Sequence, residues 1–191
     1  MKYFIDLGAY NGDTLKKAVS LYSDFDSFIG FEPVGKLYKK AVSRFKNNPK
    51  VKIHRKAASV KYGSDKIFVH ITKKGNGKGS SLHLKKKTGN LKKTQYEKIK
   101  TIDFAEYITK NFKKNDTIIL KIDIEGEEYS LLSHMIDSGA IEYIDKIYCE
   151  WHNDKIDMVA DEHDSLLSKL NELGFNLHGK NPKDDFDKIN S

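Results

Sequence analysis

Short apolar runs alternate along the chain with segments whose apolar residues recur every three or four positions. The short runs predict buried strands, and the recurring positions predict amphipathic helices. The segments expected as strands are 3–7, 27–32, 51–54, 66–71, 117–123, 146–152 and 175–178. The segments expected as helices are 14–22, 37–45, 103–112, 129–138 and 166–173. Strands that alternate with helices predict a Rossmann-like α/β fold, in which a mostly parallel central sheet has helices on both faces.

The length of 191 residues suits a single domain, 1–191, and the 38% hydrophobic share is enough for a core. The only cysteine, Cys149, excludes an internal disulfide and favours a reducing compartment. The first residues lack a signal-peptide pattern, because Asp6 interrupts their apolar run. No apolar run approaches the roughly 20 residues that span a bilayer. We therefore expect a cytoplasmic protein without membrane insertion.

The formal net charge is +7, and residues 73–100 are rich in lysine and glycine. This composition predicts a loop inside the domain, either a lid or a substrate-binding insertion, in which Ser80 and Ser81 touch substrate or cofactor. A basic loop suits an anionic partner such as nucleic acid or an acidic glycan, although a solvated lysine loop explains the same charge.

A glycine turn, Asp6-Leu7-Gly8-Ala9-Tyr10-Asn11-Gly12-Asp13-Thr14, follows the first expected strand. Gly8 permits a tight turn, and Gly12 permits a ligand to approach the backbone closely beside the helix N-terminus. The spacing matches neither the dinucleotide fingerprint nor a P-loop. Asp6 would repel a pyrophosphate but suits the ammonium group of an amino acid, which favours S-adenosylmethionine (SAM) over NAD. Glu32 ends the next strand and is placed to accept hydrogen bonds from both ribose hydroxyls.

Polar side chains follow two later strands. Asp123 and Glu125 share one side of their strand, and Glu150 and His152 share one side of the next, because side chains alternate. If these strands are neighbours, the four side chains converge at the carboxyl ends, where α/β sheets bind ligands. Two interpretations are open. Asp123, Glu150 and His152 hold Mg²⁺ or Mn²⁺, or His152 is the general base for a hydroxyl group.

Plainer roles are also open in this region. Asp123 would then contact only a cofactor, and Glu125 would accept hydrogen bonds from the turn at Gly126. Glu127 and Glu128 are expected only to favour the N-terminus of the helix that follows them.

Five segments together resemble one family, the FkbM-type methyltransferases. They are Phe4–Thr14, Phe31-Glu32-Pro33, Gly79-Ser80-Ser81-Leu82, Leu120-Lys121-Ile122-Asp123-Ile124-Glu125-Gly126-Glu127-Glu128 and Tyr148-Cys149-Glu150-Trp151-His152. The resemblance runs from Tyr3 to about Gly174. It implies a class I SAM-dependent enzyme that methylates a hydroxyl group, often on a sugar or another small molecule.

The resemblance also implies roles for individual residues. SAM would be held by the residues of the glycine turn and the two strand ends beside it, with Ala57 near the adenine: Asp6, Gly8, Asn11, Gly12, Thr14, Glu32 and Asp123. The acceptor hydroxyl would be surrounded by Asp123, Glu125, Glu150 and His152. Tyr10 replaces a glycine that is common in class I enzymes, and the fold's last hairpin would have to come from residues 175–191, which contain few strand formers.

Two alternative functions are open. A methyltransferase for the ribose 2′-hydroxyl of RNA would use the basic loop to follow a phosphate backbone, but only Tyr96 offers an aromatic ring between residues 73 and 100. A non-catalytic nucleotide- or nucleic-acid-binding module would keep the fold without chemistry, and it would have no use for converging carboxylates.

Overall fold

The structure is a computed structural model, and it describes residues 1–69, 80–82, 91–92, 94–152, 163–175 and 177. A five-stranded sheet with the order β3-β2-β1-β7-β8 forms its centre, and every neighbouring pair in it is parallel. The strands are β1 (Lys2–Leu7), β2 (Ser27–Phe31), β3 (Val51–His54), β7 (Thr117–Ile122) and β8 (Lys146–Cys149). The expected α/β fold with a mostly parallel sheet is confirmed.

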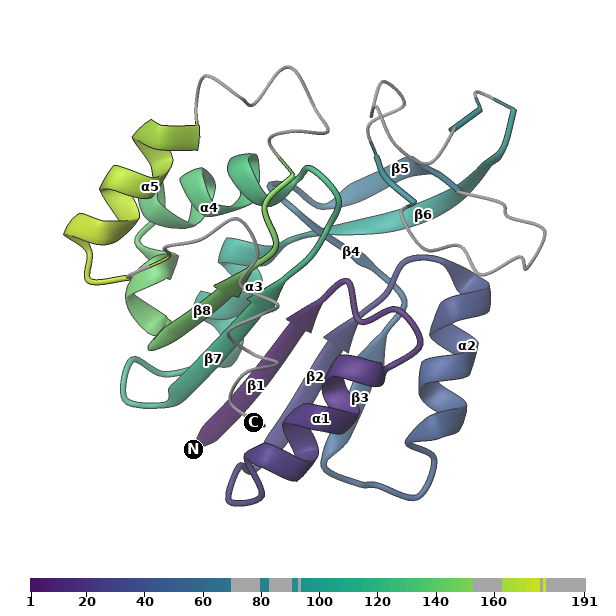
Figure 1. Cartoon of the computed structure of the whole chain (residues 1–191), viewed down its shortest axis with the longest axis horizontal. Coiled ribbons are helices and arrows are strands. Elements are labelled where there is room, and N and C mark those ends of the chain that lie inside the picture. The colour runs from purple at the N-terminus through teal and green to yellow at the C-terminus, as the bar shows by residue number, and fades with distance from the viewer. Residues whose placement is uncertain (70–79, 83–90, 93, 153–162, 176, 178–191) are drawn as a thin grey trace.

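The strand order reverses at β1, which lies between β2 and β7 (Figure 1). In this register Asp6 of β1 is opposite Gly30 of β2 and Lys121 of β7. The loops that leave β1, β2 and β7 therefore open at one edge of the sheet. Open α/β sheets bind ligands at such a switch point.

Helices cover both faces of the central sheet (Figure 1). On one face, Leu15 and Ala18 of α1 (Asp13–Leu21) pack on Phe4, Phe28 and Ile119. The neighbouring α2 (Gly35–Arg44) contacts β3. The opposite face holds the larger core, which is formed by the sheet with α3 (Phe104–Asn111), α4 (Glu128–Asp137), α5 (His163–Glu172) and the short 3₁₀ helix η1 (Ala140–Tyr143). The helices thus pack on both faces of the central sheet through apolar residues at helical spacing, as the sequence predicts.

A second sheet with the order β4-β6-β5 lies beside the first. Its strands are β4 (Ala57–Ser59), β5 (Gly63–Phe68) and β6 (Tyr96–Asp103), with β5 antiparallel to β6. The strand expected at 66–71 begins earlier, at Gly63, and ends at Phe68. The expectation of a loop up to residue 100 is wrong for residues 96–100, because they pair with β5 throughout.

Glu97 of β6 ties the second sheet to α2. Its two carboxylate oxygens accept the backbone N–H of Gly35 at 3.1 and 3.2 Å, and the same carboxylate pairs with Arg55. Gly35 is the first residue of α2, where N–H groups lack partners inside the helix. A Cβ at Gly35 would lie 2.7 Å from Arg55 Nη2 and 2.9 Å from Glu97 Oε1, so a larger residue there would displace the ends of these two side chains.

Some expectations fall on segments that the structure does not describe. They concern most of the lysine-rich segment (residues 73–79, 83–90 and 93) and the proposed last hairpin (residues 176 and 178–191). The strands expected to reach Asp123 and His152 end earlier, at Ile122 and Cys149, so the polar residues after them lie outside the strands. No helix of the described residues is long and apolar enough to cross a membrane.

Candidate functional site

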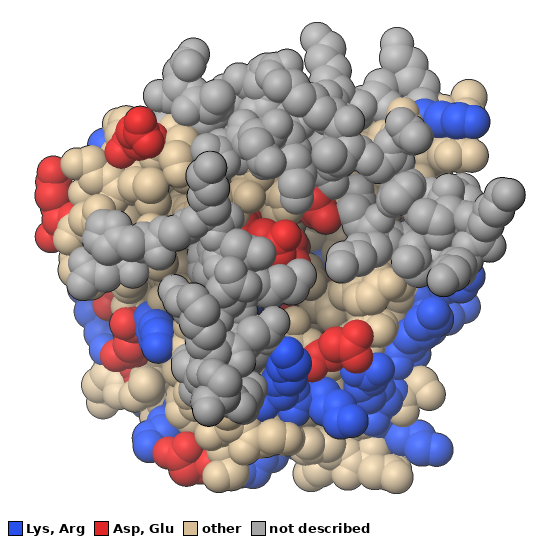
Figure 2. Space-filling model, viewed as in Figure 1, with Lys and Arg blue, Asp and Glu red and all other residues tan. Residues whose placement is uncertain are grey.

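A cavity of about 270 Å³ opens where the strand order of the central sheet reverses. Its walls come from the turns after β1, β2 and β7, from β4 and β5, and from residues 80 and 82. One part of the wall, called the apolar end here, consists of apolar residues that pack together, namely Val34, Leu37, Ala57, Ile67 and Leu82. Another part, called the acidic end, is lined by the carboxylates of Asp123, Glu125, Glu127 and Glu150. Acidic side chains lie at the centre of the face drawn in Figure 2.

The glycine turn packs directly against the turn after β7. Gly8 has a φ of 83°, and a Cβ on it would lie 1.9 Å from the carbonyl oxygen of Asp123. The N–H groups of Gly8 and Ala9 both donate to the carbonyl of Phe31 at 3.0 Å, which joins the turn to the end of β2. No other residue type fits at position 8 unless the glycine turn moves away from the turn after β7.

Glu32 holds the turn from the other side. It is buried, and its carboxylate accepts the N–H of Tyr10 at 2.9 Å and the N–H of Val34 at 2.8 Å. Tyr10 has a φ of 52°, in the left-handed region that only a few non-glycine residues adopt. Burial raises the pKa of Glu32 to about 8, although the two backbone N–H groups favour the charged form. Glu32 also lines the cavity, so this carboxyl group both shapes the turn and faces the cavity.

Lys121 forms a buried ionic bridge between β1 and β7. Its Nζ lies 3.1 Å from Asp6 Oδ1, 3.3 Å from Asp123 Oδ2 and 3.4 Å from the carbonyl oxygen of Gly8. Burial favours the neutral amine, but the two carboxylates outweigh burial and raise the pKa of Lys121. Lys121 lines the cavity, whereas Asp6 is fully buried and is not among the lining residues.

This arrangement changes the roles expected from the sequence. Asp6 was expected to contact the ammonium group of a ligand directly, but its side chain lies behind Lys121. Lys121 is a site residue that the motifs in the sequence did not predict. The signal was present, because a lysine in the run Thr117-Ile118-Ile119-Leu120-Lys121-Ile122 interrupts an otherwise apolar central strand. A lysine in such a strand requires a buried partner.

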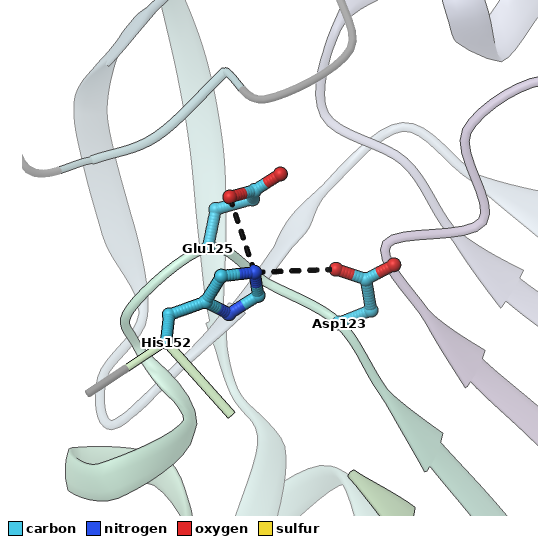
Figure 3. A group of neighbouring side chains, drawn as sticks. All are labelled: Asp123, Glu125 and His152. Carbon is cyan, nitrogen blue, oxygen red and sulfur yellow. Dashed lines mark ion pairs between the residues drawn. The ribbon is translucent and has the colours of Figure 1, made fainter. Parts of the chain in front are cut away.

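Asp123 and Glu125 after β7 lie beside His152 after β8 (Figure 3), and the two carboxylates line the cavity whereas His152 is not among its lining residues. His152 is fully buried, and its Nε2 lies 3.2 Å from Glu125 Oε2, 3.8 Å from Glu150 Oε1 and 3.9 Å from Asp123 Oδ1. The structure therefore brings together all four side chains for which convergence was expected.

One subset of this cluster has the geometry of a cation site. One ligand atom each from Asp123, Glu125 and His152 lie within 4.8 Å of one another. The set of cation ligands expected from the sequence had Glu150 in place of Glu125. Glu125 has a φ of 59°, which ends the alternation of a strand, and Ser81 Oγ donates to its carbonyl oxygen at 2.7 Å. Alternation along a strand therefore could not predict where the Glu125 carboxylate lies.

Glu128 contacts this cluster through His152 and through the turn after β7. It is fully buried and accepts the N–H of Ile124 at 2.9 Å, the N–H of Gly126 at 2.8 Å and Nδ1 of His152 at 2.9 Å. The expectation that Glu128 only favours the start of the next helix is thus wrong. A carboxylate just after a glycine turn is a signal for hydrogen bonds back to the turn, but the contact with His152 has no local signal.

Comparison with known proteins decides the family. The family model described as "Methyltransferase FkbM domain" matches residues 6–177. The chain belongs to the FkbM methyltransferase family. The crystal structure of methyltransferase FkbM from Methylobacillus flagellatus KT is similar in fold, with a TM-score of 0.53 and 14% identity. The similarity covers 88% of this chain but only 38% of that chain. No curated protein matches.

Most cofactor residues that the family resemblance implies line the cavity of this FkbM domain. They are Gly8, Asn11, Thr14, Glu32, Ala57 and Asp123. Gly12 is buried beside them, and a Cβ on it would lie 2.7 Å from the Phe45 ring. Gly12 therefore lets α1 pack closely against the end of α2. Ser80 lines the cavity, and Ser81 acts through its hydrogen bond to Glu125.

The close packing at Gly8 gives a direct test of how the site is built. Gly8→Ala should lower the free energy of unfolding by about 3 kcal/mol or more, because it adds a severe overlap to the cost of a left-handed alanine. Gly174→Ala is the matched control, because Gly174 also has a positive φ of 89° but no atom of the described residues lies within 4 Å of an added Cβ. The control should cost about 1 kcal/mol. Urea unfolding measures both losses, and equal losses would contradict the packing described here.

Proposed function

We propose that this FkbM domain transfers a methyl group from SAM to a hydroxyl group of a saccharide. The proposal rests on the different chemical character of the parts of the cavity wall. A glycine turn and a ribose-type carboxylate line it together with an apolar wall and a group of carboxylates, and these carboxylates lie around the buried imidazole of His152. SAM, when bound, supplies an electrophilic methyl group on a positively charged sulfur.

The residues present fit this cofactor. Glu32 has acceptor capacity left for ribose hydroxyls after its two backbone N–H bonds. The apolar wall that includes Ala57 suits an adenine ring. Lys121 would attract the carboxylate of the amino-acid part, and Asp123 would accept its ammonium group. Asp6 would act indirectly, because it holds the Lys121 ammonium group in place.

The acidic end suits a neutral acceptor with several hydroxyl groups. Asp123, Glu125 and Glu150 offer acceptor oxygens for hydroxyl donors, as sugars require. When an acceptor hydroxyl is methylated, its proton must leave, and His152 Nε2 is the nitrogen that faces this part of the cluster. The proposal assigns the role of base to His152 and leaves substrate positioning to the three carboxylates.

One observation favours a second acceptor class, RNA. Residues 33–64 contain no aspartate or glutamate but many lysines and arginines. In Figure 2, basic side chains gather where Figure 1 shows α1 and α2, and their exposed basic residues are Lys16, Lys17, Lys36, Lys39, Lys40 and Arg44. Such a surface attracts a phosphate backbone. The carboxylates around the reacting position oppose an anionic acceptor, so the saccharide remains the first choice.

Binding of the cofactor should depend on the ionisation of Glu32. Ribose hydroxyls donate to the charged carboxylate, so affinity for SAM should rise with pH as Glu32 ionises around its pKa of about 8. Glu32→Gln should weaken binding about 10–100-fold at pH 9 and remove most of this pH dependence. Calorimetry with SAM and with adenosine, whose charge is constant over this range, measures both effects. Equal affinities of the two proteins at all pH values would contradict the role of Glu32.

Methyl transfer itself is tested with methyl-labelled SAM and a panel of saccharides, small hydroxylated molecules and RNA. Label should appear on a saccharide, and His152→Asn should reduce transfer at least about 100-fold while SAM binding is kept. Transfer to RNA alone would replace the acceptor class. SAM binding without transfer to any acceptor would favour a non-catalytic module, and full activity of the variant would exclude His152 as the base.

We propose, as the alternative to His152 as the base, that Asp123, Glu125 and His152 hold a divalent cation that assists the reaction, in which case a carboxylate takes the hydroxyl proton. Two carboxylates and one imidazole suit Mn²⁺ or Mg²⁺, and the three ligand atoms lie close enough to share one ion. A cation there would lower the pKa of an acceptor hydroxyl. Glu150, 3.8 Å from His152 Nε2, lies beside this group and would complete it after a small movement.

The cation is tested by calorimetry with Mn²⁺. Glu125→Gln should weaken Mn²⁺ binding at least about tenfold, because it removes one charged ligand. Glu127→Gln is the matched control, because Glu127 also lines the cavity but is not part of the three-residue group. Chelation with EDTA should then stop methyl transfer. The metal proposal would be wrong if the unaltered protein did not bind Mn²⁺, or if both variants weakened Mn²⁺ binding equally.

A further inference from the structure

A basic surface lies on the same face of the molecule as the acidic side chains of the cavity. In Figure 2 the basic side chains gather where Figure 1 shows α1 and α2, and the acidic ones lie at the centre of the view. We call the exposed basic residues of the two helices the basic surface, namely Lys16, Lys17, Lys36, Lys39, Lys40 and Arg44.

The charges on α2 do not stabilise the helix that carries them. Lys36, Lys40 and Arg44 follow one another at a spacing of four residues, and like charges at this spacing destabilise a helix. Lys36 also lies in the first turn, where the helix dipole favours an acid, and this turn contains none. Arg44 pairs with Asp13, but no ion pair within the described part of the chain neutralises Lys39 or Lys40. An anionic ligand would offset this repulsion.

The basic surface is continuous with the wall of the cavity. Val34 and Leu37, at the start of α2, line the cavity. The end of α2 lies beside the glycine turn, because a Cβ on Gly12 would lie 3.5 Å from Cδ of Arg44. The helix thus runs along one side of the cavity, and its exposed face lies outside. A ligand bound in the cavity can therefore continue onto the basic surface.

We propose that the basic surface binds an anionic polysaccharide, whose acidic groups lie along α1 and α2 while one neutral sugar unit enters the cavity. The inference rests on the proposed function, because it narrows the acceptor from saccharides in general to those with acidic groups outside the methylated unit. The acidic groups are carboxylates or phosphates, which an ammonium or guanidinium group binds.

The opposite charges of the two regions favour a polysaccharide over RNA. The carboxylates of Asp123, Glu125 and Glu150 oppose an anion at the reacting position. In RNA every ribose 2′-hydroxyl lies beside a phosphate of the same chain, so an RNA acceptor would bring a phosphate to these carboxylates. A polysaccharide can carry its acidic groups on other units than the one that reacts.

The length of the basic row favours a polymer over a single sugar. Lys36 and Arg44 are eight positions apart on α2, which corresponds to about 12 Å along a helix axis. This distance exceeds the length of one sugar ring. Several units of a chain are therefore needed to reach from the cavity along the whole row.

Fluorescence anisotropy with the full chain and labelled polymers tests the proposal. Polygalacturonate, a carboxylated polysaccharide, should bind with an affinity that falls as NaCl is added, and the neutral polysaccharide dextran should not bind. Single-stranded RNA and vesicles of phosphatidylglycerol and phosphatidylcholine are the other anionic probes. The proposal is overturned if polygalacturonate does not bind, if dextran binds equally well, or if binding is confined to RNA or to the vesicles.

A double variant locates the binding surface. Lys39→Gln combined with Lys40→Gln should weaken polygalacturonate binding about tenfold. The matched control is Lys146→Gln combined with Lys169→Gln, which removes the same charge from two exposed positions. Lys146 begins β8, at the opposite edge of the central sheet from β3, and Lys169 lies on α5. Equal weakening by both double variants would overturn the proposal, because net charge alone would then explain binding.

Stability separates a binding role from a structural one. Glutamine is as good a helix former as lysine, and the loss of Lys40 removes its repulsion with Lys36 and Arg44. Urea unfolding of Lys39→Gln combined with Lys40→Gln should therefore give an equal or higher free energy of unfolding. A clear loss of stability together with the loss of binding would contradict the role proposed for these lysines.

The binding test is independent of the proposed function, because it needs neither SAM nor methyl transfer. Absence of SAM binding or of transfer would reject the proposed function, while selective binding of polygalacturonate would still support the basic surface as a binding site. Absence of polygalacturonate binding in a protein that methylates a neutral saccharide would reject the basic surface alone.

Discussion

The buried ammonium group of Lys121 is the interaction on which the rest of the site depends. It lies between Asp6 on β1 and Asp123 after β7, at the point where the strand order reverses. Two carboxylates buried this close would repel each other without a cation between them. With Lys121 present, the two strands can end side by side, and Gly8 can pack against the Asp123 carbonyl.

The cavity built on this bridge has ends of different character. The second sheet supplies much of the apolar end, and Glu97 fastens this sheet to α2 at Gly35. The residues after β7 and β8 supply the acidic end, and Glu128 forms hydrogen bonds with both of these segments. The proposed methyl transfer needs both properties, since one part of the site would hold the adenine of SAM and another would accept a hydroxyl proton. Each end is fixed by one carboxylate that comes from outside the cavity.

The sequence predicted the parts of the fold that depend on local patterns. The five strands of the central sheet are short apolar runs, and the helices have apolar residues at helical spacing. Strand β6 was missed, because its charged residues alternate with few apolar ones at the end of a lysine-rich segment. The site residues whose roles were wrongly predicted or missed are those that contact residues far away in the sequence. Lys121 pairs with Asp6 from 115 positions earlier, and Glu128 meets His152 from the next strand, so no local spacing reveals either contact.

The crystal structure of the domain with S-adenosylhomocysteine, the product of the donor, tests the account most directly. The account predicts that the ribose hydroxyls lie on Glu32, that the adenine lies against Ala57, and that the amino-acid carboxylate lies beside Lys121. The sulfur should then be directed toward His152. A ligand bound outside this cavity, or one whose ribose does not contact Glu32, would contradict it.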